Sequence, residues 1–323
     1  MQYQTALEIA NACDIHWDTF LNIVKYPEKH YRVFRIKKKS GGYRSICSPK
    51  PELALVQNFI YKNILNSVPI HDSAFAFVKK RSIKDNALKH SKSDKMLCLD
   101  IKDFFPSISR NRIYYVFMKL CNINKDLADT LVRLCTLNDG LPQGAITSPI
   151  LSNIVSYRLD KSIDNFANSN GLIYTRYADD ITISGSKESI NKVLKSQVKG
   201  IIELHGFKIN AKKSRINTIN KGAIITGLRV FNDRIQVPRN YIRKIEQDIY
   251  YLNKYGLNSY KEHEKILNNN YLGHLVGKIK FVEYIEPLKG KKLYDEFLKI
   301  DINDDLDIID DFDIFDIIET FEE

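Results

Sequence analysis

Tyr174-Thr-Arg-Tyr177-Ala178-Asp179-Asp180-Ile-Thr-Ile-Ser184 places two adjacent carboxylates between two short runs of strand-forming residues. Aromatic and β-branched residues favour strands, and an acidic pair favours a turn. The stretch therefore predicts a β-hairpin with Asp179 and Asp180 at its tip. An acidic pair at a hairpin tip is usually only a solvated turn, so its meaning depends on the segments around it.

Two upstream segments bring polar residues to the ends of apolar runs. Met96-Leu-Cys-Leu-Asp100 is an apolar strand that ends on a carboxylate, although such a residue is by itself most often a helix cap. Gly140-Leu-Pro-Gln143-Gly144 is a loop that leads into a helix, for which Ser148 is the predicted cap and Pro149 the first residue.

Carboxylates at strand ends suit divalent-metal chemistry. Mg²⁺ takes oxygen ligands and needs only one or two carboxylates when substrate phosphates complete its shell. Two such ions about 4 Å apart activate a 3′-hydroxyl and stabilise the leaving pyrophosphate. An acid at the end of one strand and an acidic pair in an adjacent hairpin form the arrangement that this chemistry requires.

In this order the segments resemble the palm motifs of reverse transcriptases, which have an α+β right-hand polymerase fold with fingers, palm and thumb. Tyr177-Ala178-Asp179-Asp180 matches the YxDD signature, and Leu141-Pro142-Gln143-Gly144 matches the loop under the incoming nucleotide. The resemblance implies two Mg²⁺ ions held by the catalytic residues Asp100 and Asp179, with Asp180 in a supporting role. It also implies that Gln143 and Gly144 contact the nucleotide, as does Lys213 in the following turn.

The resemblance also makes Phe105 a steric gate. A flat aromatic ring under the sugar leaves no room for a ribose 2′-hydroxyl, so deoxynucleotides are selected. The alternative for Phe105 is an ordinary core phenylalanine.

A basic hairpin is predicted over residues 31–48, because strand-like runs flank the turn Ser40-Gly41-Gly42. Arg44, with Lys38 or Lys39, resembles the residues of the fingers that grip the triphosphate. Arginine suits bidentate phosphate contact, whereas a solvated hairpin tip is the alternative for the two lysines.

Two short motifs resemble bacterial retron reverse transcriptases. Asn86-Ala-Leu-Lys-His90 matches their X region, and Ile225-Thr226-Gly227 matches their Y region with isoleucine in place of valine. The resemblance implies nucleic-acid contacts for Asn86, His90 and Tyr177, although a lone histidine is more often structural.

Membership of the retron class would imply an RNA-directed DNA polymerase that uses dNTPs to copy part of a cognate structured noncoding RNA into single-stranded DNA. Synthesis would start from the 2′-hydroxyl of a guanosine and leave a branched RNA–DNA product. The implied setting is anti-phage defence with a separately encoded effector protein.

The charge distribution favours a polyanionic partner. Eleven of the 39 acidic residues lie in residues 301–323, which hold no Lys or Arg, so residues 1–300 carry 49 basic and 28 acidic side chains, a net charge of +21. The five cysteines form no CxxC pair, which argues against a disulfide framework or a zinc site. The acidic N-terminus and the lack of a long apolar run predict a cytoplasmic protein without a membrane segment.

The expected organisation is a helical lead-in at 1–24, fingers at 25–95, a palm with a small antiparallel sheet at 96–237, a helical thumb at 238–300 and an acidic tail at 301–323. The first thumb helix is predicted to start with Pro238 and stop at Gly256, since Ile242, Ile245, Ile249 and Leu252 recur at helical spacing. Its basic residues would track an RNA–DNA duplex, with a solvated helix face as the alternative. They are Arg239, Arg243 and Lys244.

Two other functions stay open. The chain could also resemble a group II intron or diversity-generating reverse transcriptase. The missing maturation and endonuclease regions argue against the intron class, and the motif at 86–90 argues for the retron class. A non-catalytic alternative is a scaffold whose RNA–DNA product holds an effector inactive. The tail, rich in acids and large apolar residues, would then dock the effector or shield the basic body.

Overall fold

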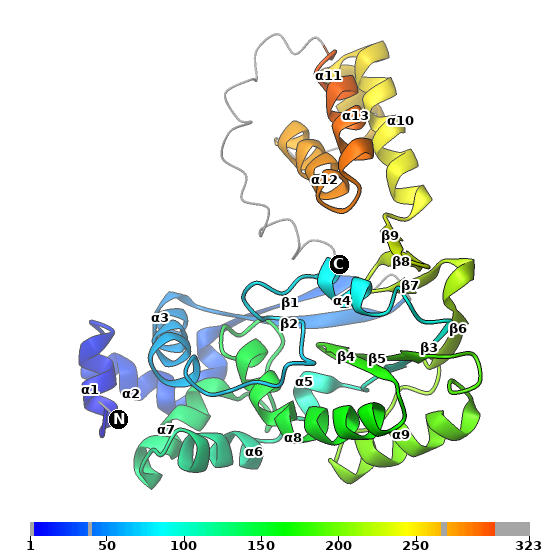
Figure 1. Ribbon diagram of the computed structural model, residues 1–323. Coiled ribbons are helices and arrows are strands. Elements are labelled where there is room, and N and C mark those ends of the chain that lie inside the picture. Colours follow the sequence, from blue (N-terminus) through cyan, green and yellow to red (C-terminus); the bar gives the residue numbers. More distant parts are fainter. Residues whose placement is uncertain (1–2, 38–40, 266–269, 301–323) are drawn as a thin grey trace. The chain divides into compact units, whose positions relative to one another are not determined.

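The computed structural model describes residues 3–37, 41–265 and 270–300. The chain forms two compact units, Met1–Thr218 and Ile219–Glu323 (Figure 1). Lys38, Lys39 and the tail at 301–323 lie outside the described residues. None of the described helices is both long and apolar enough to span a bilayer.

A four-stranded antiparallel sheet forms the centre of the first unit. Its strands lie in the order β4-β5-β3-β6, and β3 is hydrogen-bonded on both sides. The strands are β3 Lys95–Asp100, β4 Ile173–Tyr177, β5 Asp180–Gly185 and β6 Arg215–Thr218. Residues 73–75 extend the sheet at the free edge of β4, where the Arg176 amide donates to the Ser73 carbonyl at 2.7 Å.

The two faces of this sheet differ in chemistry because side chains alternate along a strand. Leu97, Leu99, Ile181 and Ile183 belong to the apolar core, together with residues of α8 Ser148–Ser169 and α9 Lys192–Leu204. The opposite face carries Thr175, Thr182 and Ser184, and α4 Ile83–Lys89 packs beside β4 (Figure 1). Asp100 and Asp180, at the ends of their strands, lie on this polar face.

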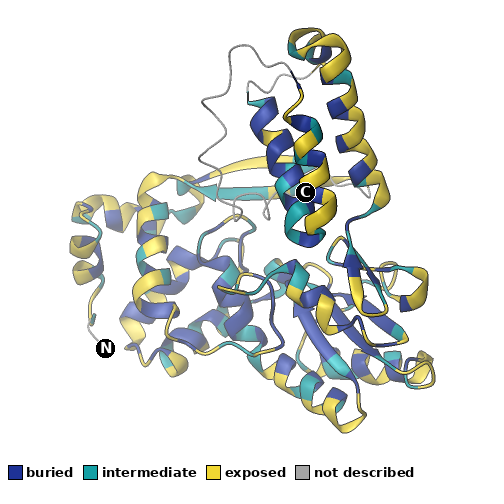
Figure 2. Cartoon of the chain, turned by 45° about the horizontal axis from the view of Figure 1, so that its top comes forward, coloured by how far each residue is buried: buried dark blue, intermediate teal, exposed yellow. Residues whose placement is uncertain are grey.

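The basic hairpin is present as predicted. Strand β1 Tyr31–Lys37 pairs antiparallel with β2 Tyr43–Pro49, and most of the hairpin is exposed or half-buried (Figure 2). The helix α3 Pro51–Ile60 follows it and is continued by the π-helical turn η2 Tyr61–Leu65.

Seven further short helices complete the described part of the first unit, and buried side chains concentrate on their inner faces (Figure 2). Among them, α5 lies shortly after β3 and contains Phe105. The seven are α1 Ala6–Ala12, α2 Trp17–Lys25, η1 Pro27–His30, α5 Phe104–Ser107, α6 Arg110–Tyr115, η3 Val116–Leu120 and α7 Lys125–Cys135.

The second unit joins a small sheet to a helical bundle. The antiparallel sheet β7-β8-β9 follows the turn η4 Ile219–Lys221, and its strands are β7 Ala223–Ile225, β8 Leu228–Phe231 and β9 Arg234–Gln236. The helices are α10 Arg239–Tyr255, α11 Leu257–Glu264, α12 Tyr271–Ile285 and α13 Pro287–Phe297.

The predicted thumb helix is confirmed as α10. Pro238 occupies the N-cap, one residue before the position expected for it, and Gly256 ends the helix with φ +74°. The four isoleucine and leucine residues at helical spacing are all buried. The units divide at 218/219, so β7–β9 fall in the same unit as these helices, whereas the sequence placed them with the palm. The functional division into fingers, palm and thumb remains a prediction.

Candidate active site

Asp100, Asp179 and Asp180 meet where β3 ends and β5 begins. Asp100 lies directly opposite Asp180 in the antiparallel register, and both project from the polar face of the sheet. Directly opposed residues have Cβ atoms about 4.5–5.5 Å apart. Asp179 is held beside them because the Ile101 amide donates to its carbonyl at 2.9 Å. The predicted hairpin, with the acidic pair at its tip, is therefore present.

The turn that presents these carboxylates has an unusual backbone. Ala178 has φ +52°, in the left-handed region that costs a residue with a Cβ about 1 kcal/mol. Asp179 follows it directly, so the direction of its carboxylate depends on this conformation.

Burial and the neighbouring acids raise the pKa values of Asp179 and Asp180. Burial, followed by the charges of Asp179 and Asp100, raises the pKa of Asp180 to about 7, although the side chain keeps contact with solvent. The pKa of Asp179 is raised by burial and then by Asp100, and Lys213 and Arg44 oppose that rise. Asp179 and Asp180 therefore keep a proton to a higher pH than an isolated carboxyl group does.

The two predicted cationic residues of this unit, Lys213 and Arg44, both lie at the acids. The Lys213 ammonium donates to Asp100 Oδ2 at 2.6 Å, and this hydrogen bond raises the pKa of Lys213. The preceding residues lie along the end of β3, where the Asn210 amide donates to the Asp100 carbonyl at 2.8 Å. Arg44 of β2 is close enough for its charge to lower the pKa of Asp179.

The donor set suits a hard divalent cation. Three carboxylates supply only oxygen, and their mutual repulsion would be relieved by positive charge. Over the described ranges, no three His, Cys, Asp or Glu side chains form a ready-made metal cage. That arrangement is compatible with Mg²⁺, which is commonly held by one or two carboxylates together with water and substrate phosphates.

Phe105 lies five residues after Asp100, at the start of α5, and its ring is half-buried. The ring contacts Phe104 and Phe77 at centroid distances of 5.5 and 6.2 Å. Its carbonyl accepts from the Leu141 amide at 3.2 Å, so the backbone of Phe105 is tied to the loop at 140–144.

The Gln143–Gly144 loop is fixed against the basic hairpin. The Cys47 amide donates to the Gln143 carbonyl at 2.7 Å. Gly144 has φ +99°, and a Cβ there would lie 2.8 Å from Ile46 Cγ2 and 3.1 Å from the Cys47 carbonyl oxygen. Only glycine allows this close approach.

The predicted helix cap was wrong in detail. Ser148 is the first residue of α8, Thr147 occupies the N-cap, and Pro149 follows Ser148. The Ser148 hydroxyl donates instead to the Pro142 carbonyl at 2.7 Å, so it closes the loop rather than capping the helix.

Gln57, which the sequence did not single out, supports the same loop. Its fully buried amide donates to Tyr31 Oη and to the Leu134 carbonyl, both at 2.8 Å, and accepts from the Ile146 amide at 3.0 Å. Gln57 thus joins β1 and α7 to the segment that follows Gln143 and Gly144. A glutamine on the apolar face of α3 was the available signal.

The expected direct contacts of His90 and Asn86 with RNA disagree with their surroundings. His90 has no exposed surface, and its two ring nitrogens bond Ser184 Oγ and Thr175 Oγ1, each at 2.7 Å. Asn86 is likewise buried. The histidine therefore joins β4 to β5 on the polar face, behind the carboxylates. Tyr177 is half-buried and opposite Asp180, so it stays a candidate for contact with nucleic acid.

The three basic candidates of α10 divide into two kinds. Arg239 and Arg243 are exposed. Lys244 is also exposed, but it pairs with the buried Asp248 at 3.2 Å and with Glu264 at 3.6 Å. Its charge is used within the helical bundle, which weakens the expectation of a phosphate contact.

The matched family agrees with this geometry. Residues 36–276 match the family described as "Reverse transcriptase (RNA-dependent DNA polymerase)". The chain is a reverse transcriptase. The match includes the four-stranded sheet, the two loops beside it and most of α10–α12, so the α+β right-hand polymerase class is confirmed.

Curated relatives define the class more closely. This reverse transcriptase is 32% identical over 249 residues to the retron Ec86 reverse transcriptase of Escherichia coli, covering 76% of this chain and 77% of the relative. It is 36% identical over 248 residues to the retron Ec73 reverse transcriptase of E. coli, covering 72% and 78%. The retron Mx162 reverse transcriptase of Myxococcus xanthus is 30% identical over 306 residues, covering 84% and 61%. The chain belongs to the retron-type reverse transcriptases and is an RNA-directed DNA polymerase that uses an RNA template and dNTPs.

Proposed function

We propose that this reverse transcriptase copies part of a cognate structured noncoding RNA into single-stranded DNA with two Mg²⁺ ions at Asp100, Asp179 and Asp180. Synthesis starts from a 2′-hydroxyl of the RNA, so the product is a branched RNA–DNA molecule. The supporting observation is the register that puts Asp100 opposite Asp180, with Asp179 hydrogen-bonded to the end of β3.

The surrounding residues divide the work of nucleotidyl transfer. Asp100 and Asp179 hold the ions, with Asp180 in support, and the ions when bound supply activation of the attacking hydroxyl and neutralisation of the leaving group. Arg44 pairs with triphosphate oxygens from β2, because a guanidinium binds phosphate through two parallel hydrogen bonds. Lys213, which donates to Asp100 Oδ2, would contact the triphosphate instead when that carboxylate holds metal ions.

The nucleotide itself rests on the loop and on the aromatic ring. The backbone of Gln143 and Gly144 supports the base, and the close approach of Gly144 to β2 together with the hydrogen bond from Cys47 to Gln143 holds that backbone in place. Phe105 lies under the sugar and excludes a 2′-hydroxyl. Tyr177 contacts the end of the growing strand, beside Asp180.

An asparagine substitution tests the catalytic assignment. Asp179→Asn is expected to abolish RNA-linked DNA in cells that express the protein with its cognate RNA, because the substitution removes a ligand charge and keeps the shape. Asp94→Asn is the matched control, since Asp94 is an exposed acid beside the other end of β3. The assay is extraction of nucleic acid followed by denaturing gels before and after debranching. Equal DNA yield from the two variants would overturn the assignment.

The proposed setting is defence against phage with a separately encoded effector protein. Asp179→Asn should then abolish protection in a plaque assay, because protection requires the RNA–DNA product. The tail at 301–323 would dock the effector through its acidic and apolar residues. Deleting it should reduce co-purification of a co-expressed effector and leave RNA-templated synthesis intact; unchanged association would remove the tail from that role.

A further inference from the structure

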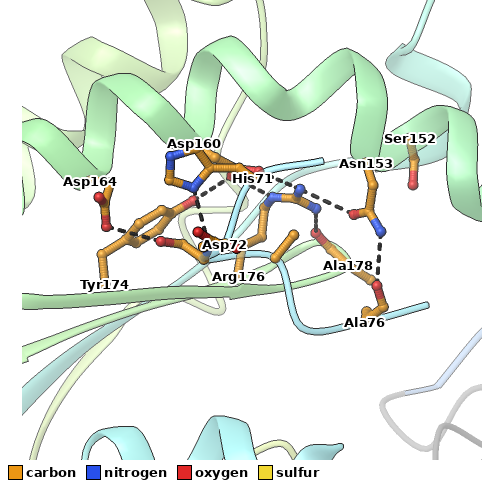
Figure 3. Close-up of polar contacts among 12 residues, drawn as sticks. His71, Asp72, Ala76, Ser152, Asn153, Asp160, Asp164, Tyr174, Arg176 and Ala178 are labelled. Carbon is orange, nitrogen blue, oxygen red and sulfur yellow. Dashed lines mark hydrogen bonds and ion pairs between the residues drawn. The ribbon is translucent and has the colours of Figure 1, made fainter. Parts of the chain in front are cut away.

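A fully buried ion pair lies behind the turn that carries the acidic residues. Arg176 of β4 and Asp160 of α8 have no exposed surface. The guanidinium grips the carboxylate through two hydrogen bonds, from Nε to Oδ1 at 2.7 Å and from Nη2 to Oδ2 at 2.6 Å (Figure 3). Neither residue touches the three acids, so the proposed chemistry gives the pair no task of its own.

The same guanidinium reaches the turn. Its Nη1 donates to the Ala178 carbonyl at 3.1 Å (Figure 3). Ala178 is the residue with φ +52°, and its carbonyl belongs to the peptide that continues into Asp179. A charged donor fixed at its other end stabilises this backbone conformation more firmly than a neutral one would. The direction of the Asp179 side chain therefore depends on where Arg176 is held.

Side chains of helix α8 hold the Arg176 guanidinium in place. Asp160 lies on this helix, as does Asn153, whose Oδ1 accepts from Nη2 of Arg176 at 3.2 Å. The Asn153 amide group also donates to the Ala76 carbonyl at 2.9 Å, so it is oriented from both sides (Figure 3). The helix starts at Ser148, directly after the loop of Gln143 and Gly144. One rigid element thus connects the loop under the nucleotide with the turn of the carboxylates.

Stability alone is a poor reason for this arrangement. Buried ion pairs are costly to desolvate, and their replacement by apolar residues of similar size is often neutral or stabilising. Three side chains, Arg176, Asp160 and Asn153, that together fix one peptide of a left-handed turn instead suggest control of position, because displacement by about 1 Å can lower a rate by about a hundredfold.

We propose that Arg176 is a positioning residue for catalysis: held by Asp160 and Asn153, it fixes the Ala178 peptide so that Asp179 and Asp180 meet Asp100. The inference rests on the proposed function of those three acids. It assigns Arg176 no contact with substrate, only control over the residues that have one.

The test compares two substitutions around the same carboxylate. Arg176→Lys keeps a positive charge near Asp160 but cannot also reach the Ala178 carbonyl and Asn153, because a single ammonium lacks the planar fork. Tyr174→Phe is the matched control: Tyr174 is buried and donates to Asp160 Oδ1 at 2.7 Å, but it does not contact the turn. Both variants lose hydrogen bonds to one buried acid, and only one loosens the turn.

Steady-state primer extension on an RNA template, with melting temperatures measured in parallel, separates the roles. Arg176→Lys is expected to lower kcat about tenfold or more, leave the KM for dNTP within about threefold, and raise the Mg²⁺ concentration for half-maximal rate. Tyr174→Phe should lower the melting temperature with near-normal values of all three. Equal kcat and Mg²⁺ dependence in the two variants would overturn the inference.

Two further variants cover the remaining outcomes. If Arg176→Lys fails to fold, Asn153→Ala replaces it, because that variant keeps the ion pair and loses only one brace of the guanidinium. A reduced kcat with unchanged KM for dNTP supports the inference, and wild-type kcat overturns it. Asp179→Asn, assayed alongside, separates the two proposals. If Asp179→Asn is active, the catalytic assignment fails. If Asp179→Asn is inactive and Arg176→Lys behaves like Tyr174→Phe, only the positioning role of Arg176 fails.

Discussion

Replacing Gly144 by alanine tests whether the nucleotide loop must lie against the basic hairpin. The new Cβ would meet Ile46 Cγ2 at 2.8 Å and the Cys47 carbonyl oxygen at 3.1 Å, and the backbone has φ +99°. Backbone strain of this kind costs about 1–3 kcal/mol. If the loop moves away to relieve the contact, the 2.7 Å hydrogen bond from Cys47 to Gln143 is lost, at about 1 kcal/mol.

Gly171→Ala supplies the comparison. Gly171 also has a positive φ, +64°, but a Cβ there meets nothing within 4 Å, so the cost is only the local strain of about 1 kcal/mol. The difference between the two variants, about 1–3 kcal/mol, measures the close approach of loop and hairpin. Because each 1.4 kcal/mol corresponds to about a factor of ten, the displaced loop should raise the KM for dNTP about tenfold.

The assay is primer extension on an RNA template over a range of dNTP concentrations, with thermal unfolding of both variants. Gly144→Ala should show the raised KM and a kcat within a few-fold of normal, whereas Gly171→Ala should match the unsubstituted protein in KM. Indistinguishable KM values for the two variants would refute the idea that contact between loop and hairpin places the nucleotide.

Three other outcomes are expected. Phe105→Val should raise the use of ribonucleotides relative to deoxynucleotides about tenfold or more, measured as the ratio of kcat/KM values; an unchanged ratio would remove Phe105 from the gate role. Burial, and secondarily Lys89, lowers the pKa of His90 to about 3 from 6.5. The stability that the neutral ring contributes is therefore complete above pH 6.5 and is lost as the pH falls from 6.5 towards 3. The slope of this loss is up to about 1.4 kcal/mol per pH unit. Denaturant titrations at pH 7 and pH 4.5 should show a smaller acid loss for His90→Gln, and an equal loss would contradict this origin. Joint replacement of Arg239 and Arg243 by glutamine should lower RNA affinity and reduce the salt dependence of binding by about one or two phosphate contacts. Lys244→Gln should mainly lower the melting temperature, because buried Asp248 loses its partner. The reverse pattern would show that Lys244 binds RNA.

Local patterns in the sequence predicted local structure well. The hairpin at Asp179 and Asp180, the hairpin of β1 and β2, and the helix that stops at Gly256 all follow from turn residues and periodicity over a few residues. The convergence of Asp100 on that hairpin came from family resemblance rather than from spacing, because 79 residues separate it from Asp179 and no local rule joins them.

The sequence was least informative where long-range contacts decide the environment of a polar residue. His90 follows α4 in a polar segment, and only the pairing of β4 with β5 shows that two hydroxyls enclose its ring. Lys244 has a place on the helix surface that suits phosphate, yet Asp248 and Glu264 are already its partners. No role for Arg176 follows from the sequence, because its partners Asp160 and Asn153 come from a helix that the sequence alone does not place behind it.

The alternation of the central sheet limits how this enzyme can change in length. Asp180 shares its face with Thr182 and Ser184, while Ile181 and Ile183 belong to the apolar core. Deleting one residue at the start of β5 would turn isoleucines to the face that carries Asp100 and bury hydroxyls or a carboxylate against the apolar core. Length variation among functional descendants of this chain should therefore fall in the connection between β5 and α9, where an extra residue leaves the parity of the strand intact.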